Sequence, residues 1–84
     1  MNREFRNLIF QLSEILDTTV DVLTVYERED HTLGFVALCY SNTERYEIYK
    51  GSAADPSKAE MVRWEKSGRT AMKKYLHVLS DSTT

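Results

Sequence analysis

The stretch from Asp55 to Leu79 constrains the fold most, because it is the longest segment with one consistent period. Its apolar side chains recur every three or four residues, the spacing that places them on one face of an α-helix. These residues are Met61, Trp64, Gly68, Ala71, Met72, Tyr75 and Leu79. Asp55 and Pro56 match a helix start, with an N-cap acid followed by proline at the first helical position. We therefore predict one long helix here, with Trp64 facing the core.

Gly68 is the unusual residue of this predicted helix. Glycine in a helix interior costs about 1 kcal/mol relative to alanine, and Gly68 follows Trp64 by one turn on the apolar face. We interpret it as a site of close packing against another backbone or an aromatic ring. The alternative is a break at Gly68 that divides the segment into two shorter helices.

The rest of the chain predicts one more helix and three strands. Residues 3–17 carry an apolar stripe at helical spacing, and residues 20–28, 32–41 and 44–50 have the β-branched and aromatic composition of strands. Residues 32–41 are the most apolar run and suit a central strand. One face would hold Leu33, Phe35, Ala37 and Cys39, and the other Val36, Leu38 and Tyr40.

Short links between the three strands predict an antiparallel meander. We expect an α+β fold with the order α-β-β-β-α, in two layers with both helices packed on one face of the sheet. Residues 1–79 would form a single domain, and the polar residues 80–84 a disordered tail.

Composition places the chain in the class of small cytoplasmic proteins. The single cysteine, Cys39, excludes an internal disulfide and fits a reducing compartment. Arg3, Glu4 and Arg6 interrupt any signal-peptide pattern, and no apolar run approaches the roughly 20 residues of a membrane span. We expect no membrane association and a role as a bacterial or phage accessory protein.

Residues that could carry catalysis or bind metal are few and scattered. His31 and His77 have no cysteine or histidine at metal-ligand spacing. Cys39 lies in the middle of a predicted strand, where a buried and inert thiol is the usual case. The acidic group Glu27, Glu29 and Asp30 lacks the spacing of a calcium-binding loop. We therefore expect a non-enzymatic protein with no cofactor and no metal.

Tyrosines are concentrated in the predicted sheet, at Tyr26, Tyr40, Tyr46 and Tyr49. If the helices cover one sheet face, the other face presents tyrosines, which are enriched in protein interfaces. The alternative is that these rings only cap the edges of a small core. The exposed helix residue Phe10 could add a further contact. The interface candidates are Phe10, Tyr26, Tyr40 and Tyr49, and we expect a homodimer or a complex with another protein.

The predicted last helix also carries a basic face. Residues 55–84 hold six basic and four acidic residues, whereas residues 1–54 hold five basic and nine acidic ones. The basic residues are Lys58, Arg63, Lys66, Arg69, Lys73 and Lys74. As the alternative function, they could contact nucleic acid. The net charge of −2 argues against strong binding, and a solvated helix face would explain them equally well.

The predicted order of helix, three strands and helix resembles the double-stranded RNA-binding domain. In that family the loop between the first two strands carries Gly-Pro-x-His, and a lysine cluster opens the last helix. This chain has Asp30 and His31 in that loop, without Gly-Pro, and a single lysine in Ser57-Lys58-Ala59. The resemblance implies a nucleic-acid partner for the basic face.

Overall fold

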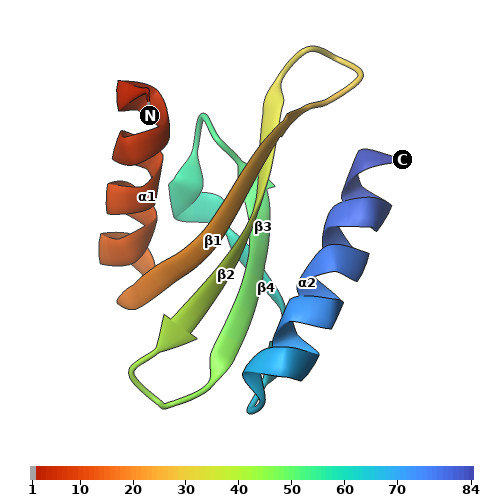
Figure 1. Cartoon of the computed structure of the whole chain (residues 1–84). Helices are drawn as coiled ribbons and strands as arrows, with labels where there is room; N and C mark the ends of the chain where they lie inside the picture. The colour runs from red at the N-terminus through yellow and green to blue at the C-terminus, as the bar shows by residue number, and fades with distance from the viewer. Residues whose placement is uncertain (1) are drawn as a thin grey trace.

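The structure is a computed structural model that describes residues 2–84. Its elements follow the order α1 (Arg3–Leu16), β1 (Thr18–Glu27), β2 (Leu33–Ser41), β3 (Tyr46–Ser52), a 3₁₀ turn η1 (Pro56–Lys58), β4 (Glu60–Glu65) and α2 (Gly68–Thr83). The strands form one antiparallel sheet in the order β1-β2-β3-β4 (Figure 1). The predicted α+β class and the antiparallel meander are therefore confirmed, with one additional strand.

The helix α1 forms where its apolar stripe predicts it. Asn2 caps its start, since the Asn2 side chain accepts a hydrogen bond from the Phe5 amide at 2.8 Å. Asp17 ends it in the left-handed conformation, with φ of 51°. Leu8 and Leu12 point into the core from this helix.

The two helices lie on opposite faces of the sheet, so the prediction that both pack on one face is wrong. One core joins Leu8 and Leu12 of α1 to Phe35, Ala37 and Cys39 of β2. The other core joins Ala71 and Tyr75 of α2 to Val36, Leu38 and Ile48. Successive strand residues point to opposite faces, and both faces of β2 are apolar. Each face therefore needs its own helix.

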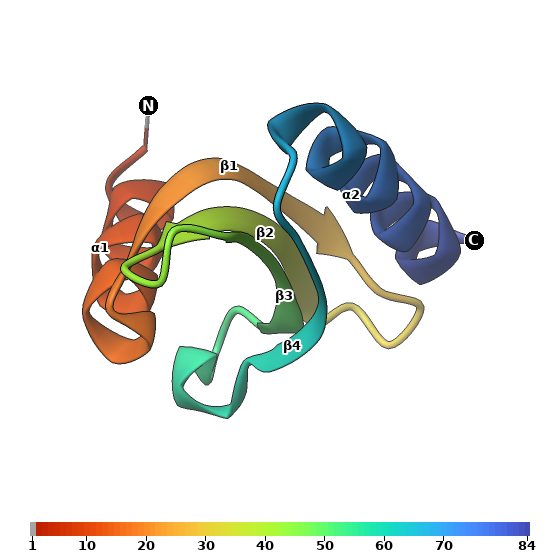
Figure 2. The same ribbon diagram turned by 90° about the horizontal axis from the view of Figure 1, so that it is seen from below.

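The sheet curls strongly, and this curl positions the connecting segments. Figure 2 shows α1 and the η1 turn on the inner side of the curl and α2 on its outer side. The turn η1 contacts α1, and Ala59 packs on the same core as Leu8. The strand β4 is an edge strand of this curved sheet.

The predicted long helix from Asp55 to Leu79 is wrong in its first half, which forms η1 and β4. A bulge between Ile48 and Tyr49 of β3 leaves Val62 as an extra residue on β4. Met61 pairs with Tyr49 and Trp64 with Glu47, so both point to the α1 face although they are three residues apart. This spacing of three imitates a helix.

The helix α2 starts at Gly68 because Ser67 caps it. The Ser67 hydroxyl accepts a hydrogen bond from the Thr70 amide at 3.4 Å. A Cβ atom on Gly68 would lie 3.1 Å from the Tyr46 hydroxyl, so a ring does pack against this glycine. The expected close packing is therefore present, at the start of a helix rather than in its interior.

Residues 80–83 form the last turn of α2, where the sequence predicted a disordered polar tail. The Ser82 hydroxyl donates to the Val78 carbonyl at 2.7 Å, and the Thr83 hydroxyl to the Leu79 carbonyl at 2.9 Å. These bonds satisfy carbonyls near the helix end.

The fourth strand also removes the resemblance to the double-stranded RNA-binding domain, because Ser57-Lys58-Ala59 opens no long helix.

Candidate protein-interaction edge

The strand β4 is an edge strand with exposed apolar side chains. It pairs with β3 on one side, and within residues 2–84 the sheet order places no strand on its other side. Met61, Val62 and Trp64 are 42%, 39% and 44% exposed. Half of the backbone N–H and C=O groups of such a strand point outward and can accept a further strand. We call the strand Glu60–Glu65, with its exposed side chains Met61, Val62 and Trp64, the β4 edge.

The exposed Trp64 is held in place by a neighbouring arginine. The Arg45 guanidinium carbon lies 4.6 Å from the centroid of the Trp64 ring. At exposed sites such a cation–π contact contributes about 0.5–1 kcal/mol. The prediction that Trp64 faces the core is wrong, because Trp64 lies on the edge strand β4 and is 44% exposed.

Arg45 is itself fixed by a buried carboxylate. Its Nε donates to Glu47 Oε2 at 2.8 Å, and the Tyr49 hydroxyl donates to Glu47 Oε1 at 2.8 Å. Glu47 is 6% exposed, and both of its oxygens have a donor. A tryptophan positioned through such a network loses little side-chain freedom on binding, which favours affinity. Burial raises the pKa of Tyr49 well above its usual range, and the Glu47 carboxylate adds to this shift.

The opposite face of β4 carries a second ion pair. Arg63 pairs with Ile48, and Glu65 with Tyr46, so both point to the α2 face. Arg63 Nε donates to Glu65 Oε2 at 2.5 Å, and both side chains remain partly exposed. The β4 edge therefore presents an aromatic and apolar surface on one face and an Arg–Glu pair on the other.

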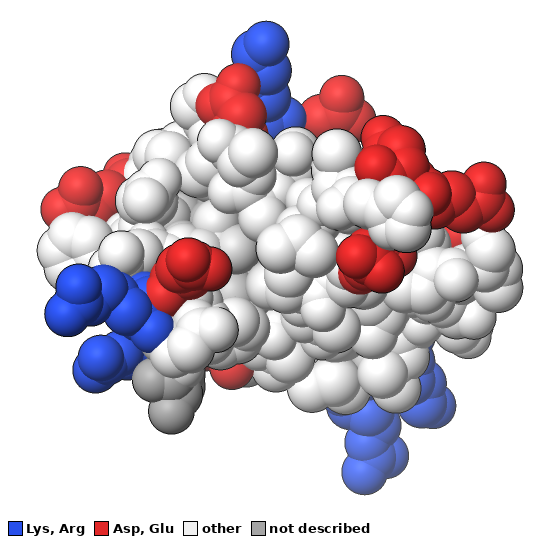
Figure 3. Space-filling view, turned by 90° about the horizontal axis from the view of Figure 1, so that it is seen from above, with Lys and Arg blue, Asp and Glu red and all other residues white. Residues whose placement is uncertain are grey.

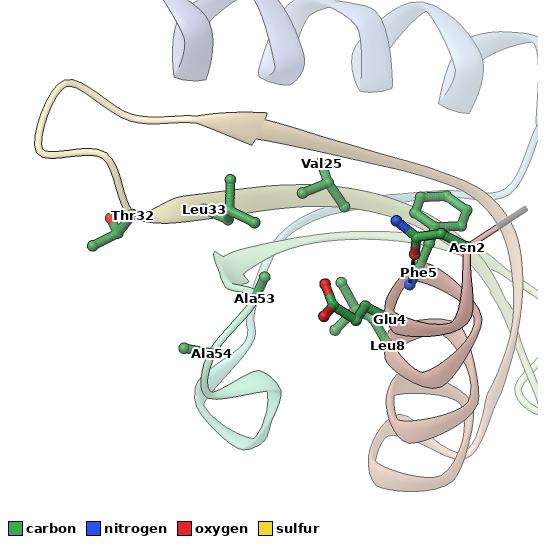
Figure 4. Close-up of a pocket in the computed structure, with 9 residues that line it drawn as sticks. All are labelled: Asn2, Glu4, Phe5, Leu8, Val25, Thr32, Leu33, Ala53 and Ala54. Carbon is green, nitrogen blue, oxygen red and sulfur yellow. Dashed lines mark hydrogen bonds between the residues drawn. The ribbon is translucent and has the colours of Figure 1, made fainter.

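A separate apolar cleft opens at the end of the molecule where α1 begins. It has a volume of about 530 Å³ and lies between α1, the start of β2 and the loop after β3. Figure 4 shows the side chains around it, which are Asn2, Glu4, Phe5, Leu8, Val25, Thr32, Leu33, Ala53 and Ala54. Figure 3 looks onto this end, where uncharged surface fills the middle and both acidic and basic groups stand around it. The size and lining are those of small-molecule sites.

The tyrosines do not form one open face. Tyr26 and Tyr46 pack beside the α2 core, and Tyr40 stacks edge-on against Tyr46 with ring centroids 4.9 Å apart. Tyr49 points to the other face, where it joins the Glu47 network. The reason is that helices cover both sides of the sheet. Phe10 is 65% exposed on α1, far from the core.

The six basic residues do not form one helix face. Lys58 lies in η1, 3.8 Å from Asp55, and Arg63 lies in β4. Lys66 lies in the link before α2, which leaves Arg69, Lys73 and Lys74 on that helix. The predicted stripe fails because it needed residues 55–79 to be one helix.

The sequence-predicted candidates for catalysis or metal binding lie in different elements, with Cys39 in β2, His31 in the β1–β2 hairpin and His77 in α2. Cys39 is buried, and burial raises the pKa of its thiol to about 11, which keeps it protonated near neutral pH. Within residues 2–84, no three His, Cys, Asp or Glu side chains are grouped to hold a metal ion. In the same residues, neither helix has the length and apolarity needed to cross a membrane.

Arg45 and Glu47 are not among the candidate residues that the sequence predicted, although both lie beside Trp64 in the structure. Arg45 and Trp64 meet because β3 and β4 pair, whereas the sequence predicts a helix for residues 60–65. The available signal was the alternation of Arg45, Glu47 and Tyr49 on one face of the third strand. Comparison of the chain with protein-family models, curated proteins and solved structures gave no match.

Proposed function

We propose that this chain is a small, non-enzymatic protein-binding module that self-associates through the β4 edge. The observation that carries the proposal is the outer edge of β4, to which no other strand of residues 2–84 is paired and on which three apolar side chains are exposed, one of them a tryptophan in contact with Arg45. Tryptophan and arginine are among the residues enriched at the positions that dominate binding energy in interfaces. The proposal keeps the expected homodimer and replaces the tyrosine-rich face by the β4 edge.

Solution mass tests this proposal. We expect sedimentation equilibrium at about micromolar concentration to give twice the 9.8 kDa monomer mass. Val62→Lys should give the monomer, because a lysine in the middle of an edge strand opposes strand pairing. Trp64→Ala should weaken association by removing the central aromatic contact.

Phe10→Ser is the matched control, since it also removes a large exposed apolar side chain, from the outer face of α1. It should leave the dimer intact. A wild-type chain that stays monomeric at all concentrations contradicts the proposal. A monomeric Phe10→Ser variant beside a dimeric Val62→Lys variant contradicts it as well, and would move the interface to α1.

A second candidate function is the binding of a small apolar ligand in the cleft beside α1. Its apolar lining and volume favour this function, and Glu4 at the rim favours a cationic head group. Hexylammonium should shift the amide resonances of Leu33 and Ala53 in a saturable manner. Ala53→Leu should abolish these shifts by filling the cleft, and Phe10→Ser should not. Shifts that grow linearly with concentration, without saturation, would contradict this function.

A further inference from the structure

We infer that two copies of this chain pair β4 against β4 in an antiparallel register centred on Trp64. In this register Trp64 lies opposite Trp64 of the second copy, and Arg63 lies opposite the second copy's Glu65. The inference rests on the self-association proposed above and specifies its geometry. It follows from the symmetry of a two-chain sheet, from the bulge at Val62 and from the charges of β4.

Symmetry restricts the possible registers to a few. Closed dimers of identical chains usually have a two-fold axis, and antiparallel pairing of one strand with its own copy places that axis perpendicular to the sheet. Directly opposite residues point to the same face. The axis therefore passes between the two copies of one residue, which lie opposite each other. The residue at the centre therefore defines the whole register.

The bulge narrows the choice to the second half of β4. At Val62 the strand loses its regular alternation with β3, and a bulge locally disrupts the ladder. Residues 63–65 alternate regularly, with Arg63 and Glu65 on the α2 face and Trp64 on the α1 face. The centre is therefore Arg63, Trp64 or Glu65.

Charge selects Trp64 among these three residues. A centre at Arg63 places two guanidinium groups directly opposite each other, and a centre at Glu65 does the same with two carboxylates. Like charges directly opposite are destabilising. A centre at Trp64 places each Arg63 opposite a Glu65, beside the pair that already exists within each chain. The four charges then alternate around a square on the α2 face.

The same register places the aromatic groups together on the other face. The two Trp64 rings become neighbours across the joint, each backed by its own Arg45 at 4.6 Å. Arg45 stays anchored to the buried Glu47 at 2.8 Å. The interface between the two β4 strands therefore has two tryptophan rings on the α1 face and four alternating charges on the α2 face.

Two charge substitutions test the register. Arg63→Glu gives a strand with Glu at both 63 and 65, and Glu65→Arg gives a strand with Arg at both positions. In the Trp64-centred register, each variant alone opposes like charges and should be monomeric. A mixture of the two variants restores both opposite-charge pairs and should form a heterodimer of equal proportions. Neither chain of the mixture keeps its own Arg–Glu pair, so the rescue separates pairing between chains from pairing within one chain.

The outcomes distinguish the register from the self-association itself. In the Arg63-centred register, Glu65→Arg leaves the central Arg–Arg pair as it is in the wild type. In the Glu65-centred register it replaces one like-charge pair by another. A Glu65→Arg variant that remains as dimeric as the wild type therefore overturns the register while leaving self-association standing. A wild-type chain that is monomeric throughout overturns self-association and the register together.

Circular dichroism provides a second, independent measurement. Trp64 is the only tryptophan of the chain, so exciton coupling between two indole rings requires a second copy. We expect an indole couplet that appears with dimerisation, is absent in Trp64→Phe, and returns in the mixture of charge variants. A dimer without this couplet contradicts the pairing of Trp64 with its own copy.

Discussion

At the scale of single residues, Arg45 connects the interior of the protein to its exposed edge. Its guanidinium group both bonds the buried Glu47 carboxylate and stacks on the exposed Trp64 ring. Burying a carboxylate is costly unless its oxygens find donors, and Arg45 and Tyr49 supply them. The position of Trp64 therefore depends on a hydrogen-bond network that lies beneath it.

Tyr49→Phe should destabilise the fold by removing one of the two donors to Glu47. We expect a loss of about 1.5–3 kcal/mol in the free energy of unfolding, the usual range for a hydrogen bond to a charged group. Chemical denaturation followed by circular dichroism measures it. Tyr40→Phe is the matched control, because within residues 2–84 the Tyr40 side chain makes no hydrogen bond; equal losses in both variants would contradict the network.

The same tyrosine predicts a pH dependence of stability. The pKa of Tyr49 in the folded chain is raised above its usual value of 10.0, chiefly by burial. The folded state therefore keeps a proton that the unfolded state releases, so the Tyr49 contribution is complete below pH 10 and is lost as pH rises beyond it. The decline of stability above pH 10 should be shallower in Tyr49→Phe than in the wild type, whereas parallel curves would contradict this account.

At the scale of secondary structure elements, the sequence predicted α1 from its apolar stripe and the first three strands from their β-branched and aromatic composition. The faces predicted for residues 33–40 are also confirmed, since Phe35, Ala37 and Cys39 lie in one core and Val36 and Leu38 in the other. The apolar character of both faces already required cover on both sides of β2. Placing both helices on one side left Val36 and Leu38 without cover.

The strand β4 could not be recognised from its local pattern. Its bulge brings Met61 and Trp64 to one face with a spacing of three residues, which is also a helical spacing. The start of α2 did leave a signal, since Ser67 is a good N-cap. The sequence predicts a helix for the segment of Trp64, which lies in β4 beside Arg45. The contact between these two residues could therefore not be predicted, and the predicted interface consisted of aromatic residues alone.

At the scale of the whole molecule, the six candidate basic residues are divided among η1, β4, the link before α2 and α2 itself. Two of the six candidate bases have acidic neighbours, with Lys58 3.8 Å from Asp55 and Arg63 2.5 Å from Glu65. Arg69 and Lys73 are four residues apart in α2 and so share a face. The acidic residues Glu27, Glu29 and Asp30 lie at the hairpin between β1 and β2, and the net charge is −2.

This distribution predicts weak or absent binding to nucleic acid. Each phosphate contact contributes roughly −0.9 to the slope of log affinity against log salt, so two bases on one face give a slope of only about −2. We expect no retarded band for a short DNA or RNA duplex at about 150 mM salt and about 10 µM protein, conditions in which exposed charges are largely screened. A clear shift that disappears in Arg69→Glu with Lys73→Glu, and persists in the monomeric Val62→Lys variant, would instead make α2 a nucleic-acid-binding helix and the β4 edge irrelevant to that activity.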